Sequence, residues 1–263
     1  MLSYQHAYHA GNAADVHKHG LLAWALGYMT AKDKPLSYIE THAGRGLYDL
    51  DGAEARRTGE AAAGIDRALA QGWFPAGHPY LAALDRVRAA EGARAYPGSP
   101  RIAAEILRPG DRIVLAELHP GENRLLAAAM KGTGAQVLHE DGLAMLIART
   151  PPDPRRGLAL IDPSFEVKAD YDRLPKLIAA VHRKWPVGVI LLWYPVLTSG
   201  LHAQMLEALE ARNLPGALRH ELRFPPARPG HGMVGSGLFA VNAPWGLAEE
   251  AARLAHAMGA AAR

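Results

Sequence analysis

Hydrophobic residues along this chain recur as short continuous runs, and most runs are followed by a segment with helical periodicity. The runs that we expect to form strands are residues 36–40, 112–118, 136–140, 158–162, 187–193 and, more weakly, 237–242. The segments that we expect to be helical include residues 121–130, 171–185, 201–212 and 247–258. Continuous apolar strands that alternate with helices predict a parallel sheet covered on both faces. The pattern therefore predicts a doubly wound α/β fold.

The interval between the first two expected strands is too long for a plain crossover. A strand–helix–strand unit needs about 30 residues, but the second strand begins only near Arg112. The excess contains two helical segments, residues 56–70 and 80–91. We therefore expect three parts. Residues 1–49 form an N-terminal tail and the first part of one α/β domain, residues 50–95 an inserted helical subdomain, and residues 96–263 the rest of the domain.

Composition narrows the class of protein only slightly. Hydrophobic residues make up 49% of the 263 residues, and 29 Lys and Arg against 26 Asp and Glu leave a formal net charge of +3. This charge allows an anionic partner without requiring one. The lack of cysteine excludes disulfides, thiolate metal sites and Cys nucleophiles. No apolar run precedes Leu21, and none reaches the roughly 18 residues of a membrane span. We therefore expect a soluble cytoplasmic protein that does not bind membranes.

Acidic residues follow three successive expected strands. The first strand leads into Glu40-Thr41-His42-Ala43-Gly44-Arg45-Gly46, a Gly-rich turn without the third glycine of a dinucleotide site. Glu117 ends the second strand, and Glu140-Asp141-Gly142 ends the third. One such acid is most often a helix N-cap, and the turn by itself is equally well an ordinary tight turn. Three acids at the carboxyl edge of one sheet favour an adenosine-containing cofactor.

The fourth expected strand ends in Asp162-Pro163-Ser164-Phe165, the most specific chemical signal in the chain. The lone pair of an exocyclic adenine amine is delocalised into the ring, so the amine is a poor nucleophile. The Asp162 carboxylate and the Pro163 carbonyl could accept both N–H bonds and localise that lone pair. The Phe165 ring could stack on the base. The alternative is an Asp-Pro turn followed by a core Phe.

The N-terminal segment is unusually rich in histidine and tyrosine. Its spacing matches no zinc pattern, so we expect no metal there. We expect residues 1–12 to have no regular structure, to be loose in the free protein and to close over a ligand. Tyr4 would touch the ligand, and Lys18 would lie at the root of this tail. Removing residues 1–8 should then leave the melting temperature unchanged and remove most of the turnover. The alternative is a tail packed permanently on the sheet, in which case the melting temperature should fall. The histidines of this segment are His6, His9, His17 and His19.

A second basic cluster lies near the C-terminal end of the chain, with Glu221 as its only acid. It is a candidate phosphate-binding surface, although a solvated strand edge and loop explain it equally well. Its members are Arg219, His220, Arg223, Arg228 and His231.

Over nearly its whole length the chain resembles the bacterial 23S ribosomal RNA adenine-N6 methyltransferases of the RlmJ type. The landmarks are numerous and in the order typical of that family. They are Met1-Leu2-Ser3-Tyr4, His9-Ala10-Gly11-Asn12, Ala14-Asp15-Val16, Lys18-His19, Thr41-His42-Ala43-Gly44, Tyr96-Pro97-Gly98-Ser99-Pro100, Glu117-Leu118-His119-Pro120, Leu160-Ile161-Asp162-Pro163 and Leu192-Trp193-Tyr194-Pro195.

The resemblance implies a Rossmann-like class I S-adenosylmethionine-dependent methyltransferase fold with a helical insertion. It implies methyl transfer to N6 of adenine 2030 in 23S ribosomal RNA during rRNA processing, with S-adenosylmethionine and no metal. We expect a monomer. The implied cofactor contacts are His19, His42, Ser99, Glu117, Asp141, Gly142 and Asp162. Asp162 is also the implied catalytic carboxylate, and the implied RNA-binding residues are Tyr4, His6, Lys18, Pro163 and Phe165.

One departure from the family affects the adenine pocket. The usual fourth motif of adenine-N6 enzymes is Asp-Pro-Pro-Tyr, whereas this chain has Ser164 and Phe165 at the last two positions. The acid, the Pro163 carbonyl and an aromatic face survive, so the expected chemistry stands. Two alternatives stay open. A DNA adenine-N6 methyltransferase usually adds a sequence-reading domain, for which the insertion is small. A non-catalytic RNA-binding protein would not need its acids intact.

Overall fold

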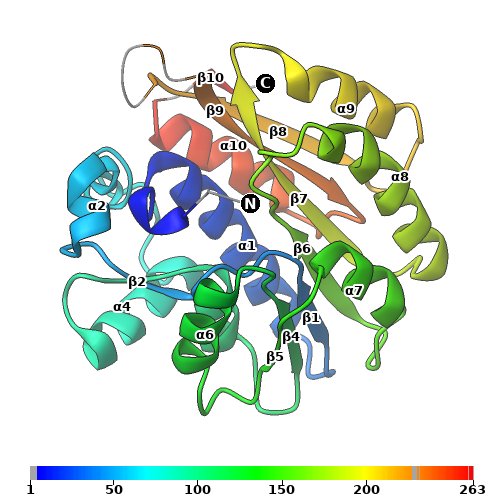
Figure 1. The fold of residues 1–263 in the computed structure, drawn as a ribbon, viewed down its shortest axis with the longest axis horizontal. Coiled ribbons are helices and arrows are strands. Elements are labelled where there is room, and N and C mark those ends of the chain that lie inside the picture. The colour runs from blue at the N-terminus through cyan, green and yellow to red at the C-terminus, as the bar shows by residue number, and fades with distance from the viewer. Residues whose placement is uncertain (1–4, 227–229, 231, 260, 263) are drawn as a thin grey trace.

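The computed structural model describes residues 5–226, 230, 232–259, 261 and 262. Within them, one twisted eight-stranded sheet lies between two layers of helices (Figure 1). Its strand order is β10 (Ala261–Ala262), β8 (Leu218–Arg223), β9 (Met233–Val241), β7 (Val189–Leu197), β6 (Gly157–Ile161), β1 (Ser37–Glu40), β4 (Arg112–Ala116) and β5 (Gln136–Leu138). Strands β5, β4, β1, β6 and β7 are parallel, and β9 runs antiparallel between β7 and β8.

Alternation along the strands assigns each side chain to one face. Tyr38 and Leu160 lie under α1 (Ala13–Thr30), α5 (Ser99–Ile106), α6 (Pro120–Ala129) and α10 (Leu247–Ala257). Ile39 and Ile161 lie under α7 (Gly142–Arg149), α8 (Ala169–Lys184) and α9 (Leu201–Glu210), the helices at the right of Figure 1. Because both faces are covered, the central strands β1 and β6 are buried along their whole length. The predicted doubly wound α/β fold is confirmed.

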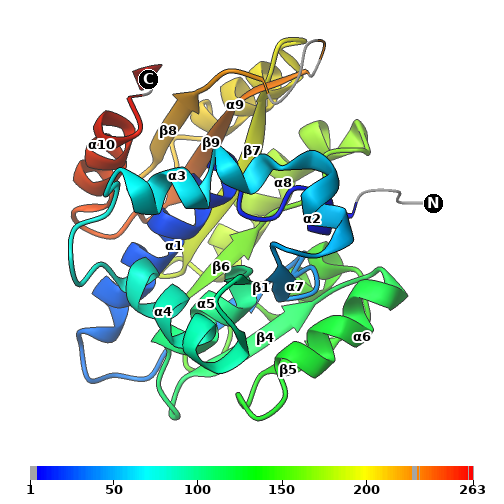
Figure 2. The same ribbon diagram turned by 90° about the vertical axis from the view of Figure 1, so that its left-hand side faces the viewer.

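The expected strands and the expected helices after residue 100 are all present, with boundaries that differ by a few residues. The helix expected over residues 56–70 is wrong as one piece. It is divided into α2 (Ala53–Thr58), η2 (Glu60–Ala62) and α3 (Ile65–Ala70), because Gly59 has a φ of +66° and ends the first helix. With α4 (Pro79–Glu91) and a separate two-stranded antiparallel sheet of β2 (Leu47–Asp49) and β3 (Ala95–Pro97), these helices pack beside α1 (Figure 2).

The N-terminal segment is more ordered than its sequence predicts. Residues His6–Tyr8 form a short 3₁₀ helix (η1), and Ala7 and Ala10 are buried. The carbonyl of Gly11 accepts a hydrogen bond from the amide of Ile65, at 2.8 Å. The expectation of an irregular, unpacked segment is therefore wrong for residues 5–12, while Tyr4 lies outside the described residues.

Helix α1 is the main element that the hydrophobic pattern did not predict. Its first half buries polar side chains, so an apolar stripe is visible only from Leu21 onward. None of the helices in the described ranges is long and apolar enough to cross a membrane.

Candidate active site

A pocket of about 380 Å³ opens at the carboxyl edge of the parallel strands. From β1 the chain continues to β4 and β5 on one side, and it then returns to β6 and β7 on the other side. Ligands of open α/β sheets bind at such a switch point. The lining includes most of the predicted site residues: His6, Lys18, His19, His42, Ser99, Glu117, Asp162, Pro163 and Phe165.

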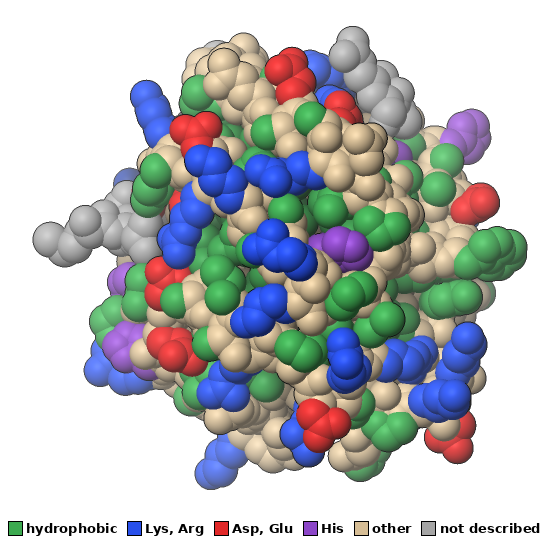
Figure 3. All heavy atoms as spheres, turned by 90° about the vertical axis from the view of Figure 1, so that its right-hand side faces the viewer, with side chains coloured by type: hydrophobic (Ala, Val, Ile, Leu, Met, Phe, Trp, Pro, Cys, Tyr) green, Lys and Arg blue, Asp and Glu red, His purple; other side chains and the backbone are tan. Residues whose placement is uncertain are grey.

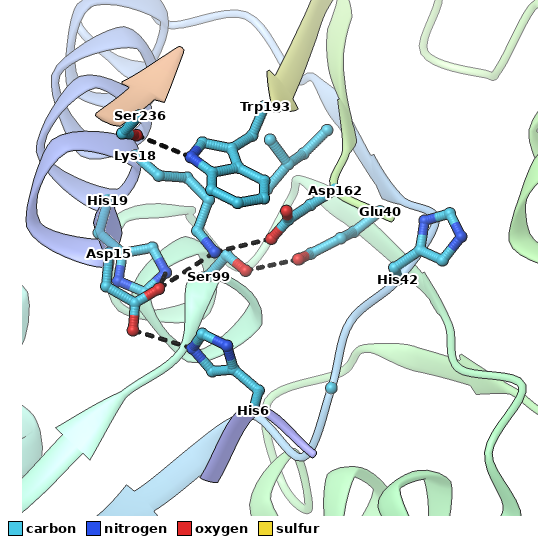
Figure 4. Close-up of polar contacts among 12 residues, drawn as sticks. His6, Asp15, Lys18, His19, Glu40, His42, Ser99, Asp162, Trp193 and Ser236 are labelled. Atoms are coloured by element: carbon cyan, nitrogen blue, oxygen red, sulfur yellow. Dashed lines mark hydrogen bonds and ion pairs between the residues drawn. The ribbon is translucent and has the colours of Figure 1, made fainter. Parts of the chain in front are cut away.

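An ion-paired lysine lies beside the predicted catalytic acid (Figure 4). The Nζ atom of Lys18 donates to Asp162 Oδ2 at 2.7 Å and lies 3.2 Å from Asp15 Oδ1. Burial would lower the pKa of Lys18, but the two carboxylates outweigh burial and raise it above its usual value. Lys18 is therefore a buried cation that holds one oxygen of Asp162 in place.

Asp15 is the second acid of this cluster, and it was not predicted as a site residue. It accepts hydrogen bonds from His6 Nε2 and from the Gly11 amide, both at 2.9 Å. Burial raises the pKa of Asp15, but His6, Lys18 and His19 together lower it well below its usual value. A signal was present in the sequence. Asp15, Lys18 and His19 have the i, i+3, i+4 spacing that places side chains on one helix face.

His19 is buried and neutral. Its Nδ1 lies 2.9 Å from the hydroxyl of Tyr96. Burial lowers the pKa of His19 to about 3, and Lys18 adds to this effect while Asp15 opposes it. His42, across Asp162 from His19 in Figure 4, has its pKa lowered to about 4, again mainly by burial. Both imidazoles are therefore polar, uncharged contacts at neutral pH.

Ser99 is hydrogen-bonded to Glu40, a buried acid at the end of β1. Its hydroxyl donates to Glu40 Oε1 at 2.5 Å, and the Tyr38 hydroxyl donates to Glu40 Oε2 at 2.8 Å. Burial raises the pKa of Glu40 to about 8. Glu40 thus fixes the start of α5 against the first strand.

Glu117 follows β4 and accepts two backbone hydrogen bonds, from Gly44 at 2.9 Å and His119 at 2.7 Å. Burial raises the pKa of Glu117. Gly44 has a φ of +62°, and a Cβ atom there would lie 2.7 Å from the Tyr48 hydroxyl. The Gly-rich turn is therefore shaped to bring its backbone to this carboxylate.

Asp141 and Gly142 lie at the start of α7 and do not line the pocket. Asp141 Oδ1 accepts from the amides of Leu143 and Ala144, at 2.8 and 3.0 Å, which is an ordinary N-cap. A Cβ atom on Gly142 would lie 1.8 Å from the Thr41 carbonyl oxygen, so only glycine fits there. Their contact with a cofactor stays a prediction.

The opposite half of the pocket is aromatic. Phe165, with a φ of +55°, has its ring centroid 4.9 Å from that of Tyr171 and 6.3 Å from that of Trp193. The indole N–H of Trp193 donates to the Ser236 hydroxyl at 2.8 Å, and the Lys18 ammonium lies 5.4 Å from the indole centroid. Trp193 and Tyr171 were not predicted as site residues, because β7 and α8 each read simply as core.

Two of the described members of the second basic cluster do not fit the predicted surface. Arg219 donates to Glu221 at 2.9 Å and to Glu210 at 3.0 Å, so its charge is already paired. His220 is buried, with its Nδ1 3.0 Å from the ring of His17. Arg223 is exposed, whereas Arg228 and His231 lie outside the described residues. The interpretation as one continuous phosphate-binding surface is therefore wrong for Arg219 and His220.

No group of three His, Asp or Glu side chains with metal-binding geometry occurs in the part of the chain that the structure describes.

The fold is the Rossmann-like fold of the class I S-adenosylmethionine-dependent methyltransferases. Its features are the parallel strand order, the antiparallel β9 inserted beside β7, and a pocket at the switch point. Within this class, the family model described as Ribosomal RNA large subunit methyltransferase D, RlmJ matches residues 33–260. The chain belongs to this family.

Individual relatives agree with this assignment. The chain is 40% identical over 252 residues to Ribosomal RNA large subunit methyltransferase J of Escherichia coli (strain K12), covering 95% of this chain and 90% of that protein. Identity to the protein of the same name from Haemophilus influenzae is 38%, covering 94% and 89% of the two chains. A crystal structure of a protein from Legionella pneumophila str. Philadelphia 1 aligns with a TM-score of 0.88 at 34% identity, covering 97% of each chain.

Proposed function

We propose that this protein transfers a methyl group from S-adenosylmethionine to the exocyclic N6 of adenine in 23S ribosomal RNA, at adenine 2030. The observation that carries the N6 chemistry is the Asp162 carboxylate, held by Lys18 between a polar half and an aromatic half of one pocket. The two relatives named as ribosomal RNA large subunit methyltransferases support the substrate class. The position of the adenine rests on the family resemblance.

The polar half has the donor and acceptor set that the cofactor requires. Each Glu117 oxygen accepts one backbone N–H, which leaves lone pairs for the two ribose hydroxyls. His19, His42 and Ser99 line the same half and would hold the methionine part. Asp141 and Gly142, at the start of α7, would lie beside the adenine of the cofactor. No phosphate needs to be accommodated, so the missing third glycine does not count against the site. S-adenosylmethionine supplies an electrophilic methyl group when bound.

Asp162 and Pro163 would then prepare the attacking amine. One Asp162 oxygen is occupied by Lys18, and the other is available to accept an N–H of the adenine amine. The Pro163 carbonyl would accept the second N–H, so that the lone pair is localised and directed at the methyl group. Asp162 would also take the proton that the nitrogen loses after transfer. The rings of Phe165 and Trp193 would hold the flipped base by stacking.

The outer surface suits a polyanionic substrate. Lys and Arg side chains are spread over the face shown in Figure 3, with acidic side chains between them. On α8, which begins beside the catalytic motif, Arg173, Lys176 and Arg183 are exposed. Such side chains attract phosphates without reading sequence.

Mapping of N6-methyladenine tests the proposal. The 23S RNA of a strain that lacks this protein should lack the mark at adenine 2030, and purified protein with S-adenosylmethionine should restore it. A DNA strand of the same sequence serves as the control for the DNA alternative. An unchanged methylation map in the deletion strain contradicts the proposal, and equal transfer to DNA contradicts the assignment of RNA as substrate.

A further inference from the structure

A chain of hydrogen bonds runs from the aromatic wall of the pocket into the core beneath α1. The indole N–H of Trp193 donates to the Ser236 hydroxyl at 2.8 Å (Figure 4). That hydroxyl lies 2.8 Å from Nδ1 of His17, and Nε2 of His17 lies 3.0 Å from Nδ1 of His220. Trp193 lines the pocket and is only partly buried, whereas Ser236 and His17 are completely buried. The chain therefore joins a ring that a ligand can touch to side chains that no ligand reaches.

The direction of each bond in this chain follows from the indole, whose N–H can only donate. Ser236 accepts from Trp193, and its own proton is directed at Nδ1 of His17. His17 then carries its proton on Nε2 and donates to His220. Burial lowers the pKa of both imidazoles, so both are neutral at neutral pH, as this arrangement requires. The Ser236 hydroxyl is thus held from the side opposite Trp193.

The backbone around Ser236 is held as closely as its hydroxyl. A Cβ atom at Gly235 would lie 2.2 Å from the Leu222 carbonyl oxygen, and one at Gly237 would lie 2.1 Å from the Tyr194 ring. Strand β9 is therefore packed against β8 and β7 without room for a side chain on either side of Ser236. The acceptor of the indole N–H has a fixed place in the sheet.

Buried polar networks whose members are hydrogen-bonded fix one orientation of the side chains that they join. Here the side chain at the pocket end is Trp193, with its ring centroid 5.4 Å from Lys18 Nζ and 6.3 Å from the Phe165 centroid. We propose that Ser236 is a positioning residue, which holds the Trp193 indole in the orientation in which the target base stacks on it. This assignment rests on the proposed function, in which Trp193 and Phe165 hold the flipped base.

A double-mutant cycle separates this role from a merely structural one. Ser236→Ala removes the acceptor, and Trp193→Phe keeps an aromatic face but removes the N–H that Ser236 holds. With an RNA hairpin that carries the target adenine, Ser236→Ala should lower kcat/KM by about 3–10-fold, the range of one neutral hydrogen bond. In the Trp193→Phe background the same substitution should cause no further loss, because the N–H is the route by which Ser236 acts.

Ser37→Ala is the matched control, because it removes another buried serine hydroxyl. Ser37 donates to the Pro154 carbonyl oxygen at 2.9 Å and lies at the start of β1, whereas the pocket opens at the carboxyl edge of the strands. This variant should keep the kcat/KM of the unaltered protein. An unchanged kcat/KM for Ser236→Ala, an equal loss in both backgrounds, or a loss of the same size in Ser37→Ala overturns the inference.

Fluorine NMR of protein labelled with 5-fluorotryptophan observes the ring without any methyl transfer. The chain has five tryptophans, and the resonance that is missing in Trp193→Phe belongs to Trp193. In Ser236→Ala this resonance should shift and broaden, because the indole loses its acceptor, while Ser37→Ala should leave it unchanged. If the unaltered protein does not methylate adenine in RNA, the proposed function fails. An unchanged Trp193 resonance in Ser236→Ala overturns the inference on Ser236, whether or not transfer occurs.

Discussion

Replacing Lys18 with Met removes the buried cation and keeps an unbranched side chain of similar length. The two carboxylates that it contacts, Asp15 and Asp162, have side chains only 2% and 13% exposed. Without Lys18 they would face each other out of water. Removing one partner of a buried ion pair costs about 3–5 kcal/mol. At about 2–4 °C per kcal/mol for a chain of this size, we expect the melting temperature to fall by roughly 6–20 °C.

The pH dependence of this loss follows from the direction of each pKa shift. The pKa of Lys18 is raised, so its contribution is complete at neutral pH and is lost only as the pH rises through the folded-state pKa. The pKa of Asp15 is lowered, so its contribution is present above roughly pH 4 and is lost as the pH falls through its folded-state value. In the Met variant the pKa of Asp15 must rise, because one of its cations is gone. The difference in stability should therefore shrink from about pH 8 to about pH 5.

Urea denaturation at these two pH values measures the effect, with methyl transfer assayed alongside. Lys176→Met is the matched control, since Lys176 is exposed on α8, and it should leave stability within about 0.5 kcal/mol. Lys18→Arg keeps the charge and should recover most of the stability. An unchanged unfolding free energy for Lys18→Met, or a loss of the same size at both pH values, would refute the argument.

Four further outcomes are expected. Asp162→Asn should lower methyl transfer by about 10²–10³ while S-adenosylmethionine binding stays within a few-fold, and near-normal turnover would exclude it as the catalytic carboxylate. Glu117→Ala should weaken cofactor binding by about 1.5–3 kcal/mol in calorimetry, and unchanged affinity would remove it from the site. Removing residues 1–8 should lower the melting temperature, because this segment makes buried contacts; an unchanged value would contradict its packing. Arg223→Ala should flatten the plot of log RNA affinity against log salt by about one unit. Arg219→Ala, which removes an ion-paired side chain, should leave that slope unchanged, and equal slopes for the two variants would contradict this difference between the two arginines.

Local patterns were sufficient for the sheet and its helix layers and for one candidate catalytic motif. Parallel strands are buried on both faces, so each reads as an apolar run wherever it lies in the sheet. Because such strands end at one edge, Glu117 and Asp162 could be assigned to the same edge before any contact was known. The long interval around residues 50–95 could be read from spacing alone.

Contacts between distant residues depended on the tertiary structure. Lys18 and Asp162 are 144 positions apart, and no periodicity relates them. Arg219 and His220 look cationic in sequence, yet one is neutralised by Glu210 and the other is buried against His17. A one-dimensional pattern gives residue type and spacing, but the partner that pairs or buries a charge is supplied by another element.

Helix α1 shows the same limit within one segment. Its first half buries Asp15, Lys18 and His19, residue types that hydrophobic patterning assigns to the surface. The charge of Lys18 is compensated by Asp15 on the same helix and by Asp162 after β6, which makes their burial possible. The contact with Asp162 exists only once α1 packs against the end of β6. The sequence by itself determined the layers and the strand-end acids. Folding decided which charges could be buried, because the cost of removing an ion from water is offset only by the partner that the fold brings to it.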